Sequence, residues 1–121
     1  MTNEAFQNLI AHRINECRDV MNARSAIYTG DEDRLAGFKE IAADTGLSPQ
    51  MVCLVLMSKH RVALTSMLRK GQTPSLDRLA EWMTDLHNYY YLLEALCSES
   101  VFSHAFDKVM KNETQKSKKA I

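Results

Sequence analysis

The sequence predicts an all-α protein, an antiparallel bundle of four to five helices, and three observations support this fold class. Apolar residues recur at steps of three and four over several long stretches, the spacing of one helical face. The few β-branched residues fall inside these helical patterns, so no strand is predicted. Only four Gly and two Pro occur in 121 residues, which indicates long elements joined by few turns.

The first two helices are predicted over residues 4–26 and 31–45. In the first, one side carries the apolar residues Phe6, Leu9, Ile10, Ile14, Cys17, Val20 and Met21. The succession of Tyr28, Thr29 and Gly30 then favours a turn. The second helix has acidic residues in its first turn and ends at Gly46 in a left-handed cap. Its inward side carries Leu35, Phe38, Ile41 and Ala42.

Ser48 as N-cap and Pro49 as first helical residue open a third helix that runs to about Lys70. Its first half, MVCLVLM, is apolar on every face. A helix tolerates such a pattern when it is buried all round, or when a second subunit covers the side that the chain leaves open. We therefore expect a homodimer or higher oligomer that associates through the third and fourth helices.

Residues 75–98 are predicted to form the central helix. Their main stripe consists of Leu79, Trp82, Leu86, Tyr89, Leu93 and Leu96. Met83, Tyr90 and Cys97 make it wider than a surface helix needs. A last helix over residues 100–111 is expected to pack Val101, Phe102, Ala105, Phe106 and Val109. Residues 1–111 would then form one domain, followed by a disordered basic tail at 112–121.

Charge and cysteine usage limit the class of protein. Lys plus Arg and Asp plus Glu both number 15, so no net field draws the chain to nucleic acid. Cys17, Cys53 and Cys97 have no metal-ligand spacing and are expected to be buried thiols in a reducing compartment. No signal-peptide core and no run of about 18 uncharged apolar residues is present. A cytoplasmic protein without a membrane segment is predicted.

Residues 38–62 have the spacing of a helix-turn-helix and resemble that motif in transcriptional repressors. Gly46 would be the turn glycine, and Val52 and Val55 would form the buried side of the second helix. Its outward side would carry Gln50, Cys53, Leu54 and Met57, of which only Gln50 can hydrogen-bond a base edge. A DNA-binding regulator is therefore kept as an alternative. For this segment, binding to nucleic acid is less favoured than contact with another protein.

A second resemblance covers residues 20–98. Arg24 precedes Tyr28 and Gly30, a helix with Phe38 follows, a Ser-Pro-opened helix carries Lys59 and Arg61, and Asp85-x-x-Asn88-Tyr89 ends an acidic helix. This order resembles the MazG-like proteins of the all-α nucleoside-triphosphate pyrophosphohydrolase superfamily, in the form found in bacteriophages. The resemblance implies a helical bundle, usually a dimer or higher oligomer. Active members split a nucleoside triphosphate into monophosphate and pyrophosphate with Mg²⁺, and a phage-encoded member would work in the host cytoplasm.

The resemblance also implies a metal site made by an E-x-x-E pair and an E-x-x-D pair on successive helices. Asp85 matches the last acid, Glu81 stands one residue before the matching Glu, and Trp82 occupies that place. Residues 57–61, where E-x-x-E would be expected, contain no acid. Two carboxylates are too few to balance a triphosphate-bound Mg²⁺, so no catalytic residue is assigned and hydrolysis is expected to be weak or lost.

The sequence therefore predicts a nucleotide-binding protein. Asp85 and Glu81 would hold a residual Mg²⁺, and the phosphates would contact Arg24, Lys59 and Arg61. Tyr89 could stack on the base. This hypothesis requires Lys59, Arg61 and Asp85 to face one pocket.

Two alternatives remain open for these residues. Lys59 and Arg61 could instead form ion pairs with Asp85 and Glu81 across two packed helices. The chain could also be a phage protein that binds and inhibits a host protein through the apolar third helix and the tyrosines at 89–91.

Overall fold

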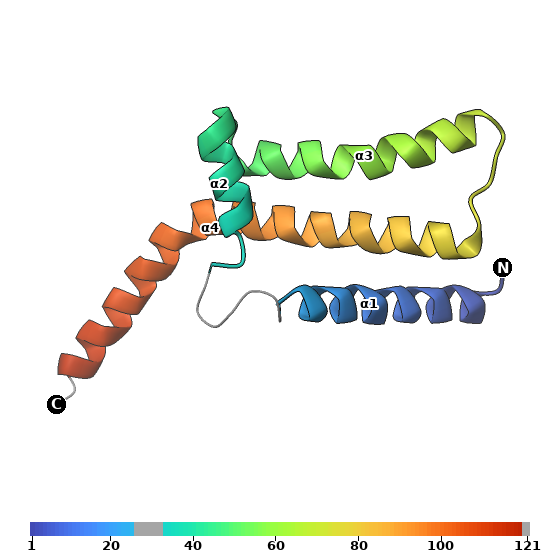
Figure 1. Ribbon diagram of the computed structural model, residues 1–121. Helices are drawn as coiled ribbons and strands as arrows, with labels where there is room; N and C mark the ends of the chain where they lie inside the picture. The colour runs from blue at the N-terminus through green and yellow to red at the C-terminus, as the bar shows by residue number, and fades with distance from the viewer. Residues whose placement is uncertain (26–32, 120–121) are drawn as a thin grey trace.

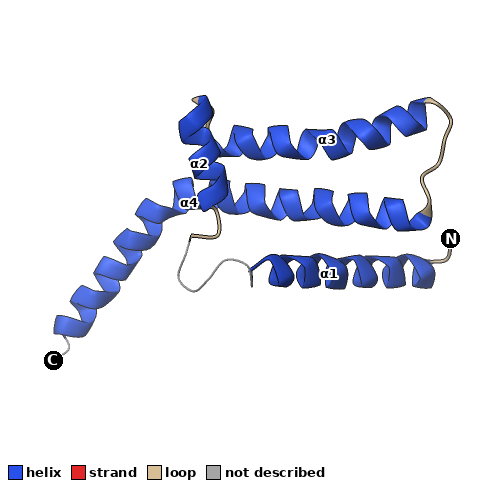
Figure 2. Cartoon of the chain, viewed as in Figure 1, coloured by secondary structure: helices blue, strands red, loops and turns tan. Residues whose placement is uncertain are grey.

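The computed structural model describes residues 1–25 and 33–119, which form four helices (Figures 1 and 2). These are α1 (Asn3–Ser25), α2 (Ala36–Thr45), α3 (Pro49–Arg69) and α4 (Leu76–Lys119). Within these ranges, the side chains of Ser25, 102–107 and 117–119 are not described. No strand occurs in the described ranges, so the predicted all-α bundle is confirmed. The turn predicted at 28–30 lies outside them.

Helix α3 packs antiparallel along the first half of α4 (Figure 1). Near the start of α3, Gln50 Nε2 donates a hydrogen bond to the Leu96 carbonyl at 3.2 Å. Further along α3, His60 lies beside Asp85, which comes earlier in α4. Residues later in α3 thus lie beside residues earlier in α4, so the two helices run in opposite directions.

Helix α1 lies on another side of α4 and runs in the same direction (Figure 1). Arg13 Nη1 donates to the Ala80 carbonyl at 3.2 Å, and Met21 and Tyr91 line one hollow further along both helices. The bundle therefore combines an antiparallel pair, α3 and α4, with a parallel pair, α1 and α4.

The central core lies where the segment leading into α2 meets α3 and α4. Leu35, Cys53 and Leu96 are buried together, and the partly buried side chains packed against them are Phe38, Tyr89, Leu92 and Leu93. Burying one large apolar side chain stabilises a fold by about 1.5–3 kcal/mol. This cluster therefore holds α3 and α4 side by side.

Local capping chemistry sets the junction between α2 and α3 as predicted. The Gly46 φ angle is 76°, and its N–H donates to the Ala42 carbonyl at the end of α2. The Ser48 hydroxyl accepts a hydrogen bond from the Met51 N–H at 3.1 Å, and Pro49 is the first residue of α3. Only glycine adopts this positive φ without strain, so the turn follows from the sequence.

Helix α2 begins at Ala36, five residues later than the start predicted at residue 31. The Asp33 carboxylate accepts a hydrogen bond from the Leu35 N–H at 2.9 Å, and the Asp33 carbonyl accepts one from Ala36 at 3.0 Å. This local turn competes with helix formation, as Asp side chains commonly do. Lys39 then forms ion pairs with Asp33 and with Glu99 of α4.

Helix α4 is continuous from Leu76 to Lys119, where the sequence predicts two helices and a disordered tail. No Gly or Pro follows Pro74, so nothing in the backbone chemistry stops the helix. The Ser100 hydroxyl donates to the Cys97 carbonyl at 3.0 Å, which keeps this residue within the helical path. The sequence predicts that Phe102, Ala105 and Phe106 are packed, but their side chains lie outside the residues that the structure describes.

Several apolar residues predicted to face inward are exposed. The α1 residues concerned are Phe6, Leu9, Ile10 and Ile14, each 40–48% exposed, and Ile41 of α2 is 39% exposed. Cys17 and Cys53 are buried, whereas Cys97 is exposed, which corrects the prediction of three buried thiols. Helical periodicity identifies these faces, and the residues that the structure describes leave them partly uncovered.

Helix α3 is the one helix in the described ranges that is long and apolar enough to cross a membrane by length and composition. The mean hydropathy of its most apolar window is 1.3, and only 17% of that window is buried. Lys59 and Arg61 stand in the middle of this helix. Each such cation costs about 2.5–3.5 kcal/mol at a bilayer centre, which disfavours a membrane span.

Candidate functional site

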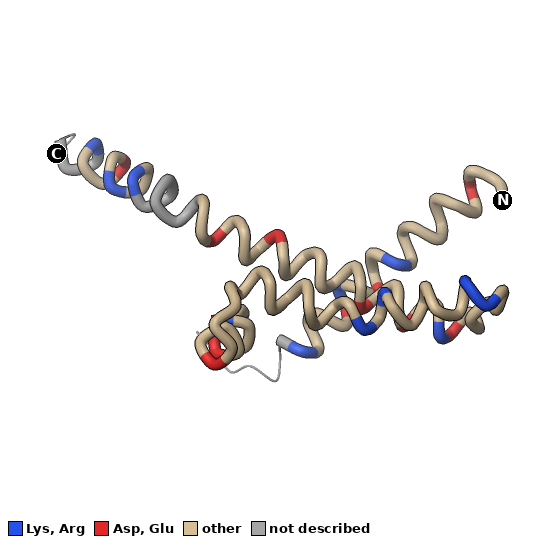
Figure 3. Tube along the Cα trace, turned by 90° about the horizontal axis from the view of Figure 1, so that it is seen from above, with Lys and Arg blue, Asp and Glu red and all other residues tan. Residues whose placement is uncertain are grey.

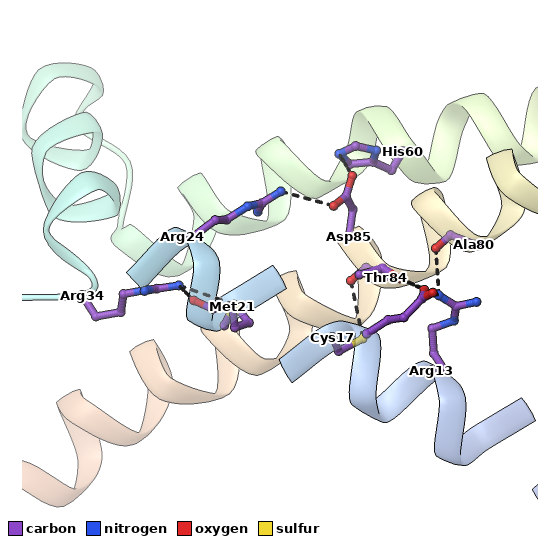
Figure 4. A network of polar contacts seen from close by, with 10 residues as sticks. Arg13, Cys17, Met21, Arg24, Arg34, His60, Ala80, Thr84 and Asp85 are labelled. Carbon is purple, nitrogen blue, oxygen red and sulfur yellow. Dashed lines mark hydrogen bonds and ion pairs between the residues drawn. The ribbon is translucent and has the colours of Figure 1, made fainter. Parts of the chain in front are cut away.

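Asp85 lies where three helices meet. Its Oδ1 atom is 3.4 Å from Arg24 Nη2 of α1, and its Oδ2 atom is 3.9 Å from His60 Nε2 of α3 (Figure 4). The side chains of His60 and Asp85 are only 16% and 19% exposed. A carboxylate with little access to water is stabilised by the neighbouring guanidinium. This centre brings two predicted residues, Arg24 and Asp85, into direct contact.

Beside this centre, a hollow of about 460 Å³ opens between α1 and α4. Its lining consists of Glu16, Asp19, Val20, Arg24, Ala80, Glu81, Thr84 and Asp85. The hollow thus contains four carboxylates but a single guanidinium, so it attracts cations and repels anions. Three residues predicted to share a site, Arg24, Glu81 and Asp85, do line one hollow.

Glu16 and Asp19 were not among the predicted site residues. They stand three positions apart on α1, in Glu16-Cys17-Arg18-Asp19, and this spacing places both on one helical side. The segment 57–61 of α3 contains no acid, whereas Glu16 and Asp19 of α1 line the hollow together with Glu81 and Asp85. The E-x-x-D spacing was visible in the sequence, whereas the register that brings it to Glu81 and Asp85 was not.

Oxygen donors of this kind suit a hard cation such as Mg²⁺, but their present arrangement does not form a metal centre. In the described residues, no three Asp, Glu, His or Cys side chains gather closely enough to hold a metal ion. The Glu16 carboxylate forms an ion pair with Arg13, and its Oε1 atom lies 2.9 Å from His12 Nε2. Arg24 forms an ion pair with Asp85. The metal role of Asp85 and Glu81 therefore stays a prediction.

Lys59 and Arg61 do not share the hollow that contains Asp85. Lys59 is exposed on α3. Arg61 lines a separate hollow of about 440 Å³ with Val62, Thr65, Ser66, Arg69 and Lys70. The requirement that Lys59, Arg61 and Asp85 face one pocket is not met within one chain. The neighbouring His60, whose imidazole does approach Asp85, is the α3 residue that reaches this centre.

Tyr89 lies next to this centre without lining the hollow. Its ring centroid is 5.8 Å from that of His60, and the two planes are tilted by 41°. Its carbonyl accepts a weak hydrogen bond from the buried Cys53 thiol at 3.5 Å. Burial raises the pKa of the Tyr89 phenol above its ordinary value. Tyr89 is thus a packing residue in this structure, whereas Tyr90 and Tyr91 are exposed.

A different polar group, the Asn88 amide, is buried one turn after Asp85. Asn88 is 1% exposed, and neither its Oδ1 nor its Nδ2 atom has a hydrogen-bond partner among the described residues. It borders a hollow of about 290 Å³ that Cys17, Arg18 and Tyr91 also line. An unsatisfied buried amide costs about 1–3 kcal/mol, so Asn88 is a destabilising feature of the core.

The α2–turn–α3 segment has the connectivity of a helix-turn-helix, but the groups that would read DNA are engaged or apolar. The Gln50 amide donates to the Leu96 carbonyl, and Cys53 is fully buried. The exposed residues of this half of α3 include Met51, Leu54 and Val55, which cannot hydrogen-bond a base edge. This surface is better suited to contact protein than nucleic acid.

Comparison of the chain with protein-family models, with curated proteins and with solved structures finds no match.

Proposed function

We propose that this protein binds a nucleotide or nucleotide-derived molecule, as its magnesium complex, in the hollow between α1 and α4. The observation that carries the proposal is the meeting of Glu16, Asp19, Glu81 and Asp85 with Arg24 around one hollow. The order of motifs that resembles MazG-like proteins supports the same ligand class. A protein of this kind from a phage would act on host nucleotides or nucleotide signals in the host cytoplasm.

The charge of the hollow decides the form of the ligand. Four carboxylates against one guanidinium repel a bare triphosphate, because like charges in a partly desolvated hollow destabilise each other. Magnesium supplied with the nucleotide neutralises part of the phosphate charge and prefers carboxylate oxygens and water as ligands. Arg24 is half-exposed and can offer its fork to a phosphate oxygen.

Binding is proposed rather than efficient hydrolysis. A pyrophosphohydrolase must position an attacking water and stabilise charge at the phosphorus, and both tasks need closely gathered groups. Two of the four carboxylates instead have cationic partners on the protein: Glu16 contacts Arg13 and His12, and Asp85 contacts Arg24. A ligand-induced closure of α1 on α4 would be needed before they could act together.

Thermal melting against a panel of nucleoside mono-, di- and triphosphates, with and without Mg²⁺, tests the proposal. A ligand present at about 100 times its dissociation constant adds about 2.7 kcal/mol to the unfolding free energy. We expect this gain for at least one nucleotide, and only with Mg²⁺.

Two matched variants locate the site. Glu81→Gln neutralises one carboxylate of the hollow, whereas Glu94→Gln makes the same change at an exposed residue of α4 outside it. The first is expected to weaken the Mg²⁺-dependent response by about tenfold in dissociation constant, equivalent to about 1.4 kcal/mol. Equal responses in the two variants, or no response to any nucleotide, would contradict the proposal.

A further inference from the structure

Positive charge gathers on α3 and the turn that follows it, without acids to balance it locally. Residues 45–76 contain no Asp or Glu. The same interval contains Lys59, Arg61, Arg69 and Lys70. Helix α3 thus carries Lys and Arg but no acid (Figure 3). The chain as a whole has no net charge, so its acids lie elsewhere, four of them in the hollow between α1 and α4.

Three of these cations line the hollow of about 440 Å³ on α3, which we call the α3 hollow. Its lining consists of the cations Arg61, Arg69 and Lys70 and of Val62, Thr65 and Ser66. All six belong to α3 or to its C-cap Lys70, so no other helix closes the hollow. The lining combines three cations with two hydroxyls and contains no acid, which is the composition of a site for an anion.

The cations of the α3 hollow have no anionic partner in the described part of the chain. Arg61, Arg69 and Lys70 are exposed, and none of them forms an ion pair with a described residue. The next acids along the chain, Asp77 and Glu81, line two hollows between α1 and α4 instead. Like charges held close together repel each other, and a bound anion relieves this repulsion.

The basic residues at the end of α3 are not needed to satisfy its last carbonyls. The Lys70 N–H donates to the Ser66 and Met67 carbonyls at 3.3 and 3.1 Å, and the Gln72 N–H donates to the Met67 carbonyl at 3.0 Å. The negative end of a helix dipole comes from carbonyls that lack such donors. The side chains of Arg69 and Lys70 therefore remain available to a ligand.

We propose that the α3 hollow binds a metal-free oligophosphate, a soluble chain of two or more phosphate groups. Arg61 and Arg69 are eight residues apart, which corresponds to about 12 Å along the helix axis. A chain of phosphates matches this spread better than a single phosphate does. Each guanidinium offers a fork to one phosphate, and the Thr65 and Ser66 hydroxyls lie between the two forks in sequence and donate to the intervening oxygens.

The α3 hollow favours a compact soluble ligand over a nucleic acid or a lipid surface. Strong binding to duplex DNA at physiological salt requires more neutralised phosphates than three cations provide. Val62 is the one apolar residue of the lining, which offers little to insert into a bilayer. The proposal does not depend on nucleotide binding between α1 and α4, because that hollow is acidic and requires Mg²⁺ to hold phosphate.

Isothermal titration calorimetry of the full-length protein with sodium tripolyphosphate, in metal-free buffer, tests the proposal. We expect a Kd below about 1 mM at low ionic strength, rising with added salt because exposed charges are screened. Sulfate at equal ionic strength carries one anionic group and is expected to bind at least about tenfold more weakly.

Matched variants locate the site. Arg69→Gln removes one cation of the α3 hollow, whereas Arg18→Gln makes the same change at an exposed residue of α1 outside it. The first is expected to raise the Kd for tripolyphosphate about tenfold, and the second less than about twofold. Circular dichroism checks that both variants keep their helices.

A hydroxyl variant separates a site with directed hydrogen bonds from a surface that attracts anions by charge alone. Thr65→Val leaves the charge unchanged and removes one donor of the α3 hollow. We expect it to raise the Kd for tripolyphosphate about threefold. Glu81→Gln, which tests the hollow between α1 and α4, should leave this Kd unchanged, so the two proposals can fail separately.

Four results would overturn the proposal. The first is no binding of tripolyphosphate at low ionic strength, and the second is equal affinity for tripolyphosphate and sulfate. The third is an equal loss of affinity in Arg69→Gln and Arg18→Gln, or no loss in Thr65→Val. The fourth is tighter binding to duplex DNA or to phosphatidylglycerol vesicles than to tripolyphosphate, which would assign the cations to a nucleic acid backbone or a lipid surface.

Discussion

Arg13 of α1 donates a hydrogen bond from Nη1 to the Thr84 hydroxyl of α4 at 2.6 Å. The same atom also reaches the Ala80 carbonyl and forms an ion pair with Glu16. The Arg13 side chain is only 14% exposed. This one guanidinium therefore joins the two parallel helices through the Glu16 carboxylate, the Thr84 hydroxyl and the Ala80 carbonyl.

Replacing Arg13 by Met is expected to lower the unfolding free energy by about 1–3 kcal/mol, because the Thr84 hydroxyl and Ala80 carbonyl lose their charged partner. Urea denaturation followed by circular dichroism measures the change. Arg18→Met, at an exposed position on the same helix, is the control and should change stability by less than about 0.5 kcal/mol. Equal losses in the two variants would show that the contact contributes nothing specific.

Asn88→Leu is expected to raise the unfolding free energy by about 1–3 kcal/mol, because it removes a buried amide that has no partner in the described chain. The adjoining hollow gives room for the branched side chain. Asn15→Leu, on the exposed side of α1, measures the gain that comes from helix propensity alone. A loss of stability in Asn88→Leu would mean that the amide is satisfied in solution.

The three thiols are expected to react at different rates with a thiol-specific disulfide reagent. Cys97 is exposed, whereas burial raises the pKa of both Cys17 and Cys53 and keeps them protonated. One thiol should therefore react within seconds and the other two only as fast as the chain unfolds. Cys97→Ser should remove the fast phase, and a fast phase that persists would show that the core around Cys53 is open.

Stability is expected to fall as the pH rises above about 9. The ordinary pKa is 9.0 for Cys17 and Cys53 and 10.0 for Tyr89, and the fold raises all three. A raised folded-state pKa means that the unfolded chain releases these protons first. The contribution to stability is thus complete below pH 9 and is lost as the pH passes through the folded-state values. Urea midpoints across this range measure it, with Tyr89→Phe expected to reduce the slope above about pH 10.

Features that depend on nearby residues could be predicted from the sequence. Gly46 and Ser48 cap the helices on either side of their turn, because these effects act within four residues. The expected break near Ser98 was wrong for a related reason. Ser is only a weak helix breaker, and the apolar periodicity continues across this position without Gly or Pro.

The candidate site could be predicted only in part, because it depends on the register between helices. Glu81 and Asp85 share a side of α4 by their spacing alone. Whether Arg61 or His60 reaches Asp85 depends on how α3 is rotated about its axis, and periodicity does not fix that rotation to within one residue. The meeting of Asp85 with Glu16 also requires the parallel placement of α1, which no local pattern reveals.

The length of α4 has a consequence for how this protein behaves in solution. Its 44 residues follow a helical path of about 66 Å, and the last part of the helix bends away from the bundle (Figure 1). A compact chain of this size has a radius of gyration of about 14 Å. An elongated body diffuses more slowly than a sphere of equal mass. Elution volume or a diffusion coefficient alone would therefore overstate the molecular weight, and a single copy could be mistaken for a pair.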